Sequence, residues 1–218
     1  MTELLFAGEH FVARADRTLF HPSSQTLFLS DLHLGKAQVF QAAGIPVTDA
    51  SEHQDLARLD QAIQDTGALH VWILGDLFHQ VSCIQACQIQ QWSSHFQTHT
   101  ATAQVILGNH DRSGHALAEQ LGLTVCPEPS QWNGIQLAHH PDPNRHAPRI
   151  AGHIHPQVQF KSASDHLVYP CFAIPHSHEL LLPAFTGFSG GPRFDAKQTS
   201  CYAITPIGVL PPGKMTPR

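Results

Sequence analysis

The chain has 218 residues, which is enough for one domain with a substantial core or for two very small domains. Apolar residues make up 42% and charged residues 13%, a balance that excludes a disordered acidic or basic chain. The formal net charge of −5 argues against a surface coated in positive charge for binding duplex DNA. No apolar run approaches the roughly 18 residues of a membrane span, and the N-terminus lacks the pattern of a signal peptide, so we expect a cytoplasmic protein.

Short apolar runs alternate with amphipathic stretches over the first two-thirds of the chain. Three of these runs predict buried strands, at Thr26–Leu29, Val71–Leu74 and Val105–Leu107. The stretches between and after them predict three helices, at Ala50–Asp65, Ile84–Phe96 and Ser113–Leu121. Asp49 and Glu52 resemble a capping box at the start of the first helix, and Gly67 is a plausible stop after it.

The texture of the sequence changes after Pro127. Short apolar runs separated by Pro, Asn, Ser and Asp predict strands and loops with little helix, at Ile135–Ala138, Gln157–Phe160 and Glu179–Leu182. No repeat or long linker divides the chain. We therefore expect one α/β layer structure, with sheet packed inside and helices outside.

Polar clusters follow five strand-like runs. They are Ser30–His33, Gly75–Asp76, Gly108–Asp111, His139–Pro141 and Gly152–His155. Because the carboxyl ends of strands form the ligand crevice of open α/β sheets, we expect these clusters to converge on one site. The glycines at 75, 108 and 152 allow a tight turn where a polar side chain must point inward.

The clusters contain seven nitrogen or oxygen donors and no sulfur: Asp31, His33, Asp76, Asn109, His139, His153 and His155. Mixed imidazole and carboxylate donors suit Mn, Fe, Co or Zn, and the missing thiolate disfavours a structural zinc site. Seven donors exceed the needs of one tetrahedral ion, whereas two ions about 3.5–4 Å apart with one shared carboxylate would use them. Each cluster alone has an ordinary explanation as a turn or a helix cap. Only their joint occurrence predicts a metal site.

The five cysteines are odd in number and contain no Cys-x-x-Cys. Without a secretory signal, this usage predicts reduced thiols and neither a disulfide framework nor a zinc knuckle.

The order of these motifs over Leu27–His155 resembles the calcineurin-like metallophosphoesterase superfamily. More narrowly, six segments resemble the bacterial ligase-associated DNA damage response endonuclease (PdeM) subgroup: Ser30–Lys36, Gly44–Pro46, Gly75–His79, Gly108–Arg112, Gly152–Pro156 and Leu182–Phe185. One departure is Thr186–Gly191, which stands where Gly-x-Phe-Thr-Gly-Gly is expected. The resemblance implies a single metallophosphoesterase domain over residues 1–218, a layered α/β/β/α sandwich with its metal site at the carboxyl ends of the strands.

The resemblance also implies a division of the ligands between two divalent ions, with Mn²⁺ as the first expectation and Fe, Co or Zn as alternatives. One ion would be held by Asp31, His33, Asp76 and His155. The other would be held by Asp76, Asn109, His139 and His153, with Asp76 bridging. His139 is preferred over His140 because the superfamily's ligand is the first polar residue after that strand. The two cations would lower the pKa of a bridging water and neutralise the phosphate during an in-line displacement.

Five further residues have predicted roles around the metals. His110 is expected to protonate the leaving alkoxide or to hydrogen-bond the charged oxygens, with Asp111 orienting its ring. Lys36 and Arg112 adjoin the motifs and are candidates for phosphate binding, with a solvated surface position as the alternative. His79 is a candidate for substrate contact, with a supporting or surface position as its alternative.

A rival motif is present near the C-terminal end. Gly187–Gly191 matches the Gly-x-Ser-x-Gly elbow of α/β-hydrolases, but the last histidine, His178, precedes Ser189, so the triad cannot be completed in that family's order. The chain also lacks a P-loop and a His-Glu-x-x-His motif, which excludes a P-loop NTPase and a zincin protease.

The substrate is less defined than the metal site. The subgroup resemblance implies DNA phosphodiesters, with DNA ligases or helicases as functional partners. Six of the 12 cationic residues lie in or near the motifs and predict a local positive rim: Lys36, Arg112, Arg145, Arg149, Lys161 and Arg193. A DNA endonuclease or phosphodiesterase in repair is the first expectation. A small-molecule or cyclic-nucleotide phosphodiesterase and a non-catalytic metal-binding subunit are the alternatives.

Overall fold

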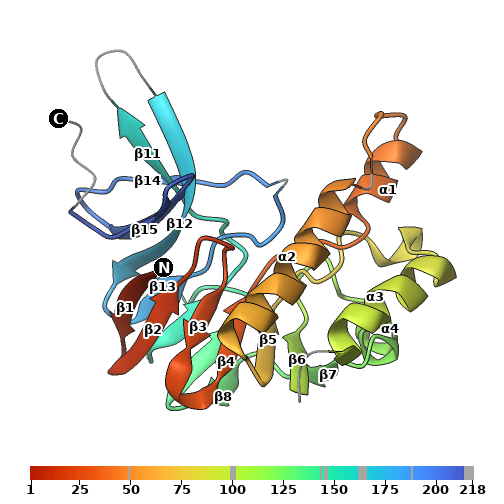
Figure 1. Cartoon of the computed structure of the whole chain (residues 1–218), viewed down its shortest axis with the longest axis horizontal. Coiled ribbons are helices and arrows are strands. Elements are labelled where there is room, and N and C mark those ends of the chain that lie inside the picture. Colours follow the sequence, from red (N-terminus) through yellow and green to blue (C-terminus); the bar gives the residue numbers. More distant parts are fainter. Residues whose placement is uncertain are drawn as a thin grey trace.

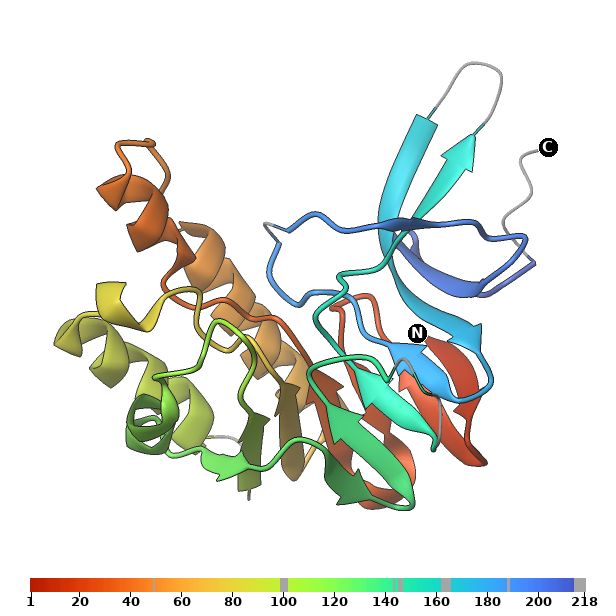
Figure 2. The same cartoon turned by 180° about the vertical axis from the view of Figure 1, so that it is seen from behind.

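Two β-sheets form the centre of the computed structural model (Figures 1 and 2), which describes residues 1–48, 50–98, 102–142, 144, 147–161, 166–187 and 189–213. The first sheet has seven strands in chain order: β1 (Thr2–Phe6), β2 (Glu9–Ala13), β3 (Leu19–His21), β4 (Thr26–Leu29), β5 (His70–Leu74), β6 (Thr102–Ile106) and β7 (Thr124–Cys126). Strands β1 to β4 pair antiparallel, and β4 to β7 pair parallel.

The second sheet has nine strands, seven of them in the order β14-β11-β12-β13-β10-β9-β8, with β15 paired to β12 and β16 to β15. Their bounds are β8 (Ser130–Trp132), β9 (Ile135–Ala138), β10 (Arg149–Ala151), β11 (Gln157–Lys161), β12 (His166–His176), β13 (Glu179–Leu181), β14 (Arg193–Phe194), β15 (Ser200–Thr205) and β16 (Gly208–Leu210). Strand β10 pairs parallel with both β9 and β13. These three strands therefore end on the same edge of the second sheet.

The described residues form four α-helices and two short 3₁₀ turns. The helices are α1 (Lys36–Ala42), α2 (Ala50–Thr66), α3 (Ala86–Thr98) and α4 (His115–Gln120), and the turns are Pro22–Ser24 and Val81–Cys83. The three helices predicted from apolar spacing are confirmed within two residues at each end. Helix α1 was not predicted, and the proposed capping residue Asp49 lies outside the described residues.

The apolar residues of the central strands divide between two cores. Leu27 and Leu29 of β4 pack with the helices, whereas Phe28 packs between the sheets against Leu137 and Phe172. A strand buried on both faces is a continuous apolar run, which is why its sequence shows no alternation. Figure 1 shows α2, α3 and α4 beside β4 to β7. The predicted layered α/β sandwich is confirmed. In the described part of the chain, strands β11, β14 and β15 extend the second sheet, and their apolar residues form a third core cluster on its outer face.

Strand β12 is the longest strand and was missed in the sequence. It contains Pro170 and Pro175, and proline within a run argues against a central strand. The structure accommodates Pro175 at a register shift between Ala173 and His176. The bulge therefore accounts for Pro175, whereas Pro170 lies opposite Gln157 in the register of β11 and β12.

The parallel strands bring the polar clusters of both sheets to one edge of the sandwich. A parallel bridge between Ser30 and Ala184 joins the end of β4 to the segment after β13. No helix among the described residues is long and apolar enough to cross a membrane. All five cysteines are free thiols.

Candidate metal centre

The seven predicted ligands come together where the parallel strands end. The first sheet supplies four of them after β4, β5 and β6: Asp31, His33, Asp76 and Asn109. The second sheet supplies three after β9 and β10: His139, His153 and His155. Four overlapping groups of possible metal ligands have all their donor atoms within 4.8 Å of one another: Asp31–His33–His155, Asp31–Asp76–His139, His139–His140–His153 and His33–His79–His110. These His and Asp groups can hold metal ions.

Asp76 lies in the middle of these groups and is 2% exposed. Its Oδ1 atom is 3.5 Å from Nε2 of His139, and its Oδ2 atom is 4.0 Å from Nε2 of His33. The backbone N–H of His110 donates a 3.0 Å hydrogen bond to Oδ1 and holds the carboxylate in place. The two oxygen atoms of Asp76 therefore face candidate ligands from both sheets.

His139 presents a nitrogen lone pair to the centre. Its Nδ1 atom lies 3.1 Å from the carbonyl oxygen of Leu74. Because a carbonyl oxygen only accepts hydrogen bonds, Nδ1 carries the proton and Nε2 keeps its lone pair. Nε2 lies 3.0 Å from Oδ1 of Asn109 and 3.0 Å from Nδ1 of His153. An imidazole with a carbonyl behind it and its other nitrogen facing further donors has the arrangement of a metal-ligating histidine.

Asp31 and His155 form a buried contact between the two sheets. Oδ1 of Asp31 lies 3.0 Å from Nε2 of His155. Neither atom has a hydrogen bond of good geometry in the part of the chain that the structure describes. Burial raises the pKa of Asp31, but the neighbouring His155 and then His139 outweigh it, so the net pKa is lowered. Burial likewise lowers the pKa of His155, but Asp31 outweighs it and the net pKa is raised.

These two buried atoms face each other without a well-formed hydrogen bond, and a bound cation would satisfy both, because a buried polar group without a hydrogen bond is costly. Burial lowers the pKa of His33 to about 3. Burial and the neighbouring His139 and His140 lower the pKa of His153. Both imidazoles are thus neutral near pH 7, which is the form that binds a metal. The donor set of imidazole, carboxylate and amide fits a divalent ion such as Mn, Fe, Co or Zn.

Backbone strain is concentrated in the same residues. Nine described residues other than glycine have a positive φ, and five of these are candidate ligands with φ between 47° and 65°: Asp31, His33, Asp76, His153 and His155. This left-handed conformation is unfavourable for residues with a Cβ and persists only where the surroundings impose it, most often at functional sites. This backbone conformation directs the side chains that follow the strands toward the centre.

Three glycines give the ligands room. A Cβ on Gly75 would lie 2.0 Å from Nδ1 of His139, and one on Gly108 would lie 2.2 Å from Oδ1 of Asp76. A Cβ on Gly152 would lie 2.7 Å from Oδ2 of Asp31. The sequence predicted tight turns at all three positions, but only Gly75 has a positive φ, of +87°. Close approach of a ligand is the requirement that all three share.

His110 lies on the open side of the centre, with 39% of its side chain exposed. Its Nδ1 atom is 2.9 Å from the backbone carbonyl oxygen of His79, which fixes the proton on Nδ1. Its Nε2 atom is 3.9 Å from Oδ2 of Asp76. The rings of His79 and His110 stack with centroids 5.1 Å apart.

Asp111 has a different position from the one expected. It is fully buried, and its carboxylate accepts hydrogen bonds from the backbone N–H groups of Leu77, Phe78 and Gly108. The sequence interpretation gave it the task of orienting the His110 ring, but the His79 carbonyl occupies that position. Asp111 instead joins the two loops that follow β5 and β6. Burial raises its pKa, although these backbone hydrogen bonds oppose the change.

A cleft of about 220 Å³ opens over the centre and is lined by candidate ligands together with Lys36, His79, Ser189 and Gly190. Lys36 and His79 therefore lie where the sequence interpretation expected substrate. Burial lowers the pKa of both side chains. Arg112 is exposed and is not among the described residues that line the cleft.

The predicted positive rim is incomplete. The Arg149 guanidinium donates to Oε1 of Gln136 at 2.7 Å and to the carbonyl oxygen of His140 at 2.9 Å, so it supports β10 and is not a free cation. Arg193 is exposed in β14. Arg145 and the side chain of Lys161 lie outside what the structure describes.

The structure separates His139 from His140. His139 is fully buried and faces the centre, whereas His140 is exposed, with Nδ1 3.2 Å from Oε1 of Glu128. His140 still belongs to one ligand group with His139 and His153. The directed lone pair favours His139.

Sequence reasoning missed Ser189 and Gly190, which line the cleft from the loop after β13. That loop is tied to the centre, because the backbone N–H of Thr186 donates to the carbonyl oxygen of Asp31 at 3.2 Å. A Cβ on Gly191 would lie 2.0 Å from the carbonyl oxygen of His155. The glycine-rich run in Gly187–Gly191 carried this information, but it was weighed only as a rival hydrolase motif.

Comparison with known proteins supports the fold. No protein-family model matches the chain, and no curated protein matches its sequence. The structure is similar to the crystal structure of Pseudomonas putida nuclease MPE, with a TM-score of 0.82 and 27% identity over 96% of this chain and 98% of that chain. A protein of unknown function from Aquifex aeolicus gives a TM-score of 0.42 at 18% identity, covering 60% of this chain and 78% of that chain, which is too low to support an argument.

Proposed function

We propose that this protein is a metal-dependent nuclease of the calcineurin-like metallophosphoesterase type, within or near the bacterial ligase-associated endonuclease subgroup. One observation carries the proposal: two carboxylates, an amide and four imidazoles converge from the ends of five strands, and the carboxylates and imidazoles form overlapping ligand groups. The similarity to a nuclease over nearly the whole chain supports the same reading.

The donors present would hold two divalent ions, with Mn²⁺ as our first choice. Asp31, His33, Asp76 and His155 form one set, and Asp76, Asn109, His139 and His153 form the other, so Asp76 belongs to both. When bound, such a pair supplies an activated water and neutralises the charge on the phosphate.

The remaining chemistry belongs to side chains of this chain. Hydrolysis adds one water across a P–O bond, giving a phosphomonoester and an alcohol, and the leaving oxygen needs a proton. The His79 carbonyl holds Nδ1–H of His110, so Nε2 is the atom that can deliver that proton. Lys36 lines the cleft and would contact a phosphate oxygen. Asp111 would keep the loops after β5 and β6 in register.

DNA in repair, with a DNA ligase or helicase as functional partner, remains our proposal for the cellular role, and the five free thiols favour the reducing cytoplasm as its location. A small or cyclic phosphodiester is the second candidate substrate. The engaged Arg149 and the exposed Arg112 favour it, because Lys36 is the one lysine or arginine among the described residues that line the cleft, and a long polyanion needs several cations.

The test is to strip the protein of metal, restore Mn²⁺, and assay a labelled single-stranded oligonucleotide beside methyl p-nitrophenyl phosphate. We expect no turnover without metal and cleavage of both substrates with it, with two ions per chain by elemental analysis. Turnover of the small diester alone would favour the second candidate. Turnover of neither, with metal bound, would contradict an enzyme and leave a metal-binding subunit.

A further inference from the structure

A second cavity adjoins the metal cleft. It has a volume of about 240 Å³ and shares His33 and Lys36 with the cleft. Its remaining walls come from α1, the segment Val47–Thr48, the start of α2 and Thr186 after β13. A ligand whose phosphate lay in the metal cleft would therefore extend past Lys36 into this cavity.

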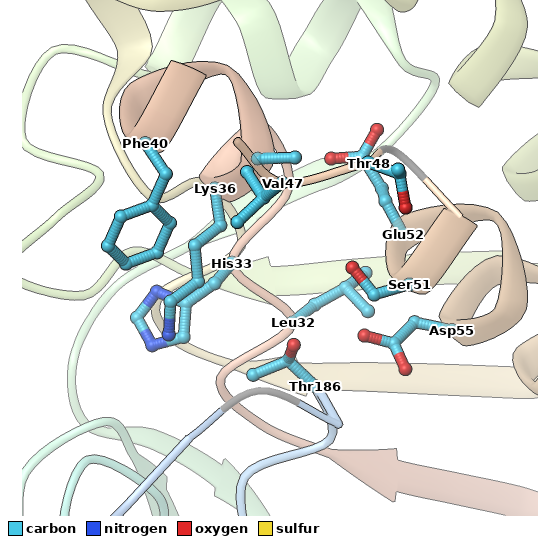
Figure 3. Close-up of a pocket in the computed structure, with 11 residues that line it drawn as sticks. Leu32, His33, Lys36, Phe40, Val47, Thr48, Ser51, Glu52, Asp55 and Thr186 are labelled. Atoms are coloured by element: carbon cyan, nitrogen blue, oxygen red, sulfur yellow. The ribbon is translucent and has the colours of Figure 1, made fainter. Parts of the chain in front are cut away.

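The cavity has two chemically different sides, which Figure 3 shows. Phe40 lies on the same side as Lys36 and His33, and Leu32, Ala37 and Val47 add apolar surface. The opposite side carries the oxygen atoms of Ser51, Glu52 and Asp55.

The acidic side determines which ligand group can enter. Asp55 is 4% exposed and accepts from the backbone N–H of Gly187, and Glu52 accepts from the backbone N–H of Gly35 at 2.6 Å. Both carboxylates are thus fixed in place. Asp55 is also paired with Arg58 at 2.7 Å, and Glu52 also accepts from Nε1–H of Trp92 at 3.1 Å. Their remaining oxygen lone pairs attract a group with N–H donors. A planar apolar group with an exocyclic amine matches both sides of the cavity.

The aromatic side is continuous with the centre. The Phe40 ring is stacked on His79 with centroids 6.4 Å apart, and His79 is stacked on His110. A base stacked on Phe40 would therefore have one ring, that of Phe40, between itself and His79. It would have two rings, those of Phe40 and His79, between itself and His110. The cavity is slightly smaller than a typical drug-sized pocket, a size that suits a single base.

Resting on the proposed function, we infer that this cavity binds the base of one nucleotide next to the scissile phosphate. The nucleotide must be unpaired to enter, and bases with an exocyclic amine are preferred. Lys36, at the junction of the two cavities, would lie beside the scissile phosphate, to which the sugar of that nucleotide is bonded.

The test uses a single-stranded oligonucleotide in which one abasic residue is moved along the chain. Cleavage in the metal-loaded protein should fall roughly tenfold or more at the bond that has the abasic residue on one fixed side, since base stacking on an aromatic side chain has about that value. Phe40→Ala should lower strand cleavage about tenfold more than hydrolysis of methyl p-nitrophenyl phosphate, and it should abolish the abasic effect.

Val39→Ala is the matched control, since Val39 is a half-buried apolar residue of the same helix that does not line the cavity among the described residues. It should leave both activities and the abasic effect unchanged. Ala37→Leu fills the cavity from the helix and should reproduce the effect of Phe40→Ala, whereas Val39→Leu should not. Circular dichroism of each variant separates these effects from unfolding.

Cytosine and thymine at the sensitive position form a second comparison, because both are pyrimidines and only cytosine has an exocyclic amine. Faster cleavage with cytosine is expected. Equal cleavage with both bases would overturn the assignment of the oxygen-lined side. Equal cleavage beside abasic and normal residues, with the small diester still hydrolysed, would overturn the base site and leave the phosphodiesterase proposal standing. Loss of both substrates in the wild-type protein would instead overturn the proposed function, and the base site with it.

Discussion

The first sheet supplies both carboxylates and the amide of the candidate centre, whereas the second sheet supplies only imidazoles. Asp31 and Asp76 are almost completely buried, so their charge is compensated at close range. His139 and His153, in the neutral form that binds a metal, need no such compensation. We infer that the first sheet provides the attraction for cations and that the second completes their coordination. Each of the following predictions tests that division.

The largest effect is expected at Asp76. Asp76→Asn removes the charge that faces both ligand sets, so it should lose more bound Mn²⁺ than Asn109→Ala in the first sheet or His153→Ala in the second, each of which removes a donor from one set only. Elemental analysis of the purified, folded variants measures this. Full metal occupancy in Asp76→Asn would contradict its bridging position.

The next largest effect concerns the catalytic rate and not metal binding. His110→Ala should retain its metal content but lose about 10²- to 10⁴-fold in rate, because Nε2 is the proposed proton donor. The loss should shrink for nitrophenyl esters, whose leaving group needs little protonation. A uniform loss over alkyl and nitrophenyl esters would instead indicate that His110 stabilises the phosphate oxygens.

A third prediction concerns the space that the first sheet leaves for a ligand of the second. Gly75→Ala places a methyl group against His139, whereas Gly134, at φ +77°, has no atom within 4 Å of an added Cβ. Gly134→Ala should cost only the left-handed penalty of about 1–2 kcal/mol in the free energy of unfolding. Gly75→Ala should cost more and should also reduce bound metal. Urea unfolding and metal analysis compare the two, and equal costs would show that His139 is not held tightly.

The smallest effect concerns two cations, Lys36, which lines the cleft, and Arg149, which lies in β10. Lys36→Gln in α1 should flatten the dependence of log K on log salt for oligonucleotide binding by about 0.7 for a single strand or 0.9 for duplex. Arg149→Ala in β10 should leave this slope unchanged, since its guanidinium is engaged by Gln136 and His140. Fluorescence anisotropy over a salt series measures both. A flatter slope for Arg149→Ala alone would show that Arg149 contacts phosphate, as the predicted positive rim requires.

Local sequence patterns were sufficient to predict elements whose residue spacing is set by one physical constraint, such as burial of one helix face. The apolar spacing of Leu56, Leu59 and Ile63 indicated α2, because those residues face the core at the period of a helix. The same patterns failed for β1 to β3 and β12. Strands β1 to β3 are only three to five residues long and pair with their neighbours in chain order, and β12 contains two prolines, which argue against a strand in any local window.

The sequence determined the donors of the candidate centre, because Asp, Asn and His after an apolar run can be read without knowing where the run ends in space. Only the tertiary structure decided which atom each donor presents. The carbonyls of Leu74, at the end of β5, and of His79, in the loop after it, lie far from their partners in sequence and select the tautomers of His139 and His110. Burial by both sheets sets the pKa of His33, and long-range hydrogen bonds engage Asp111 and Arg149 elsewhere. Hydrogen bonding and burial depend on neighbours in space, so these properties exist only once the two sheets have packed.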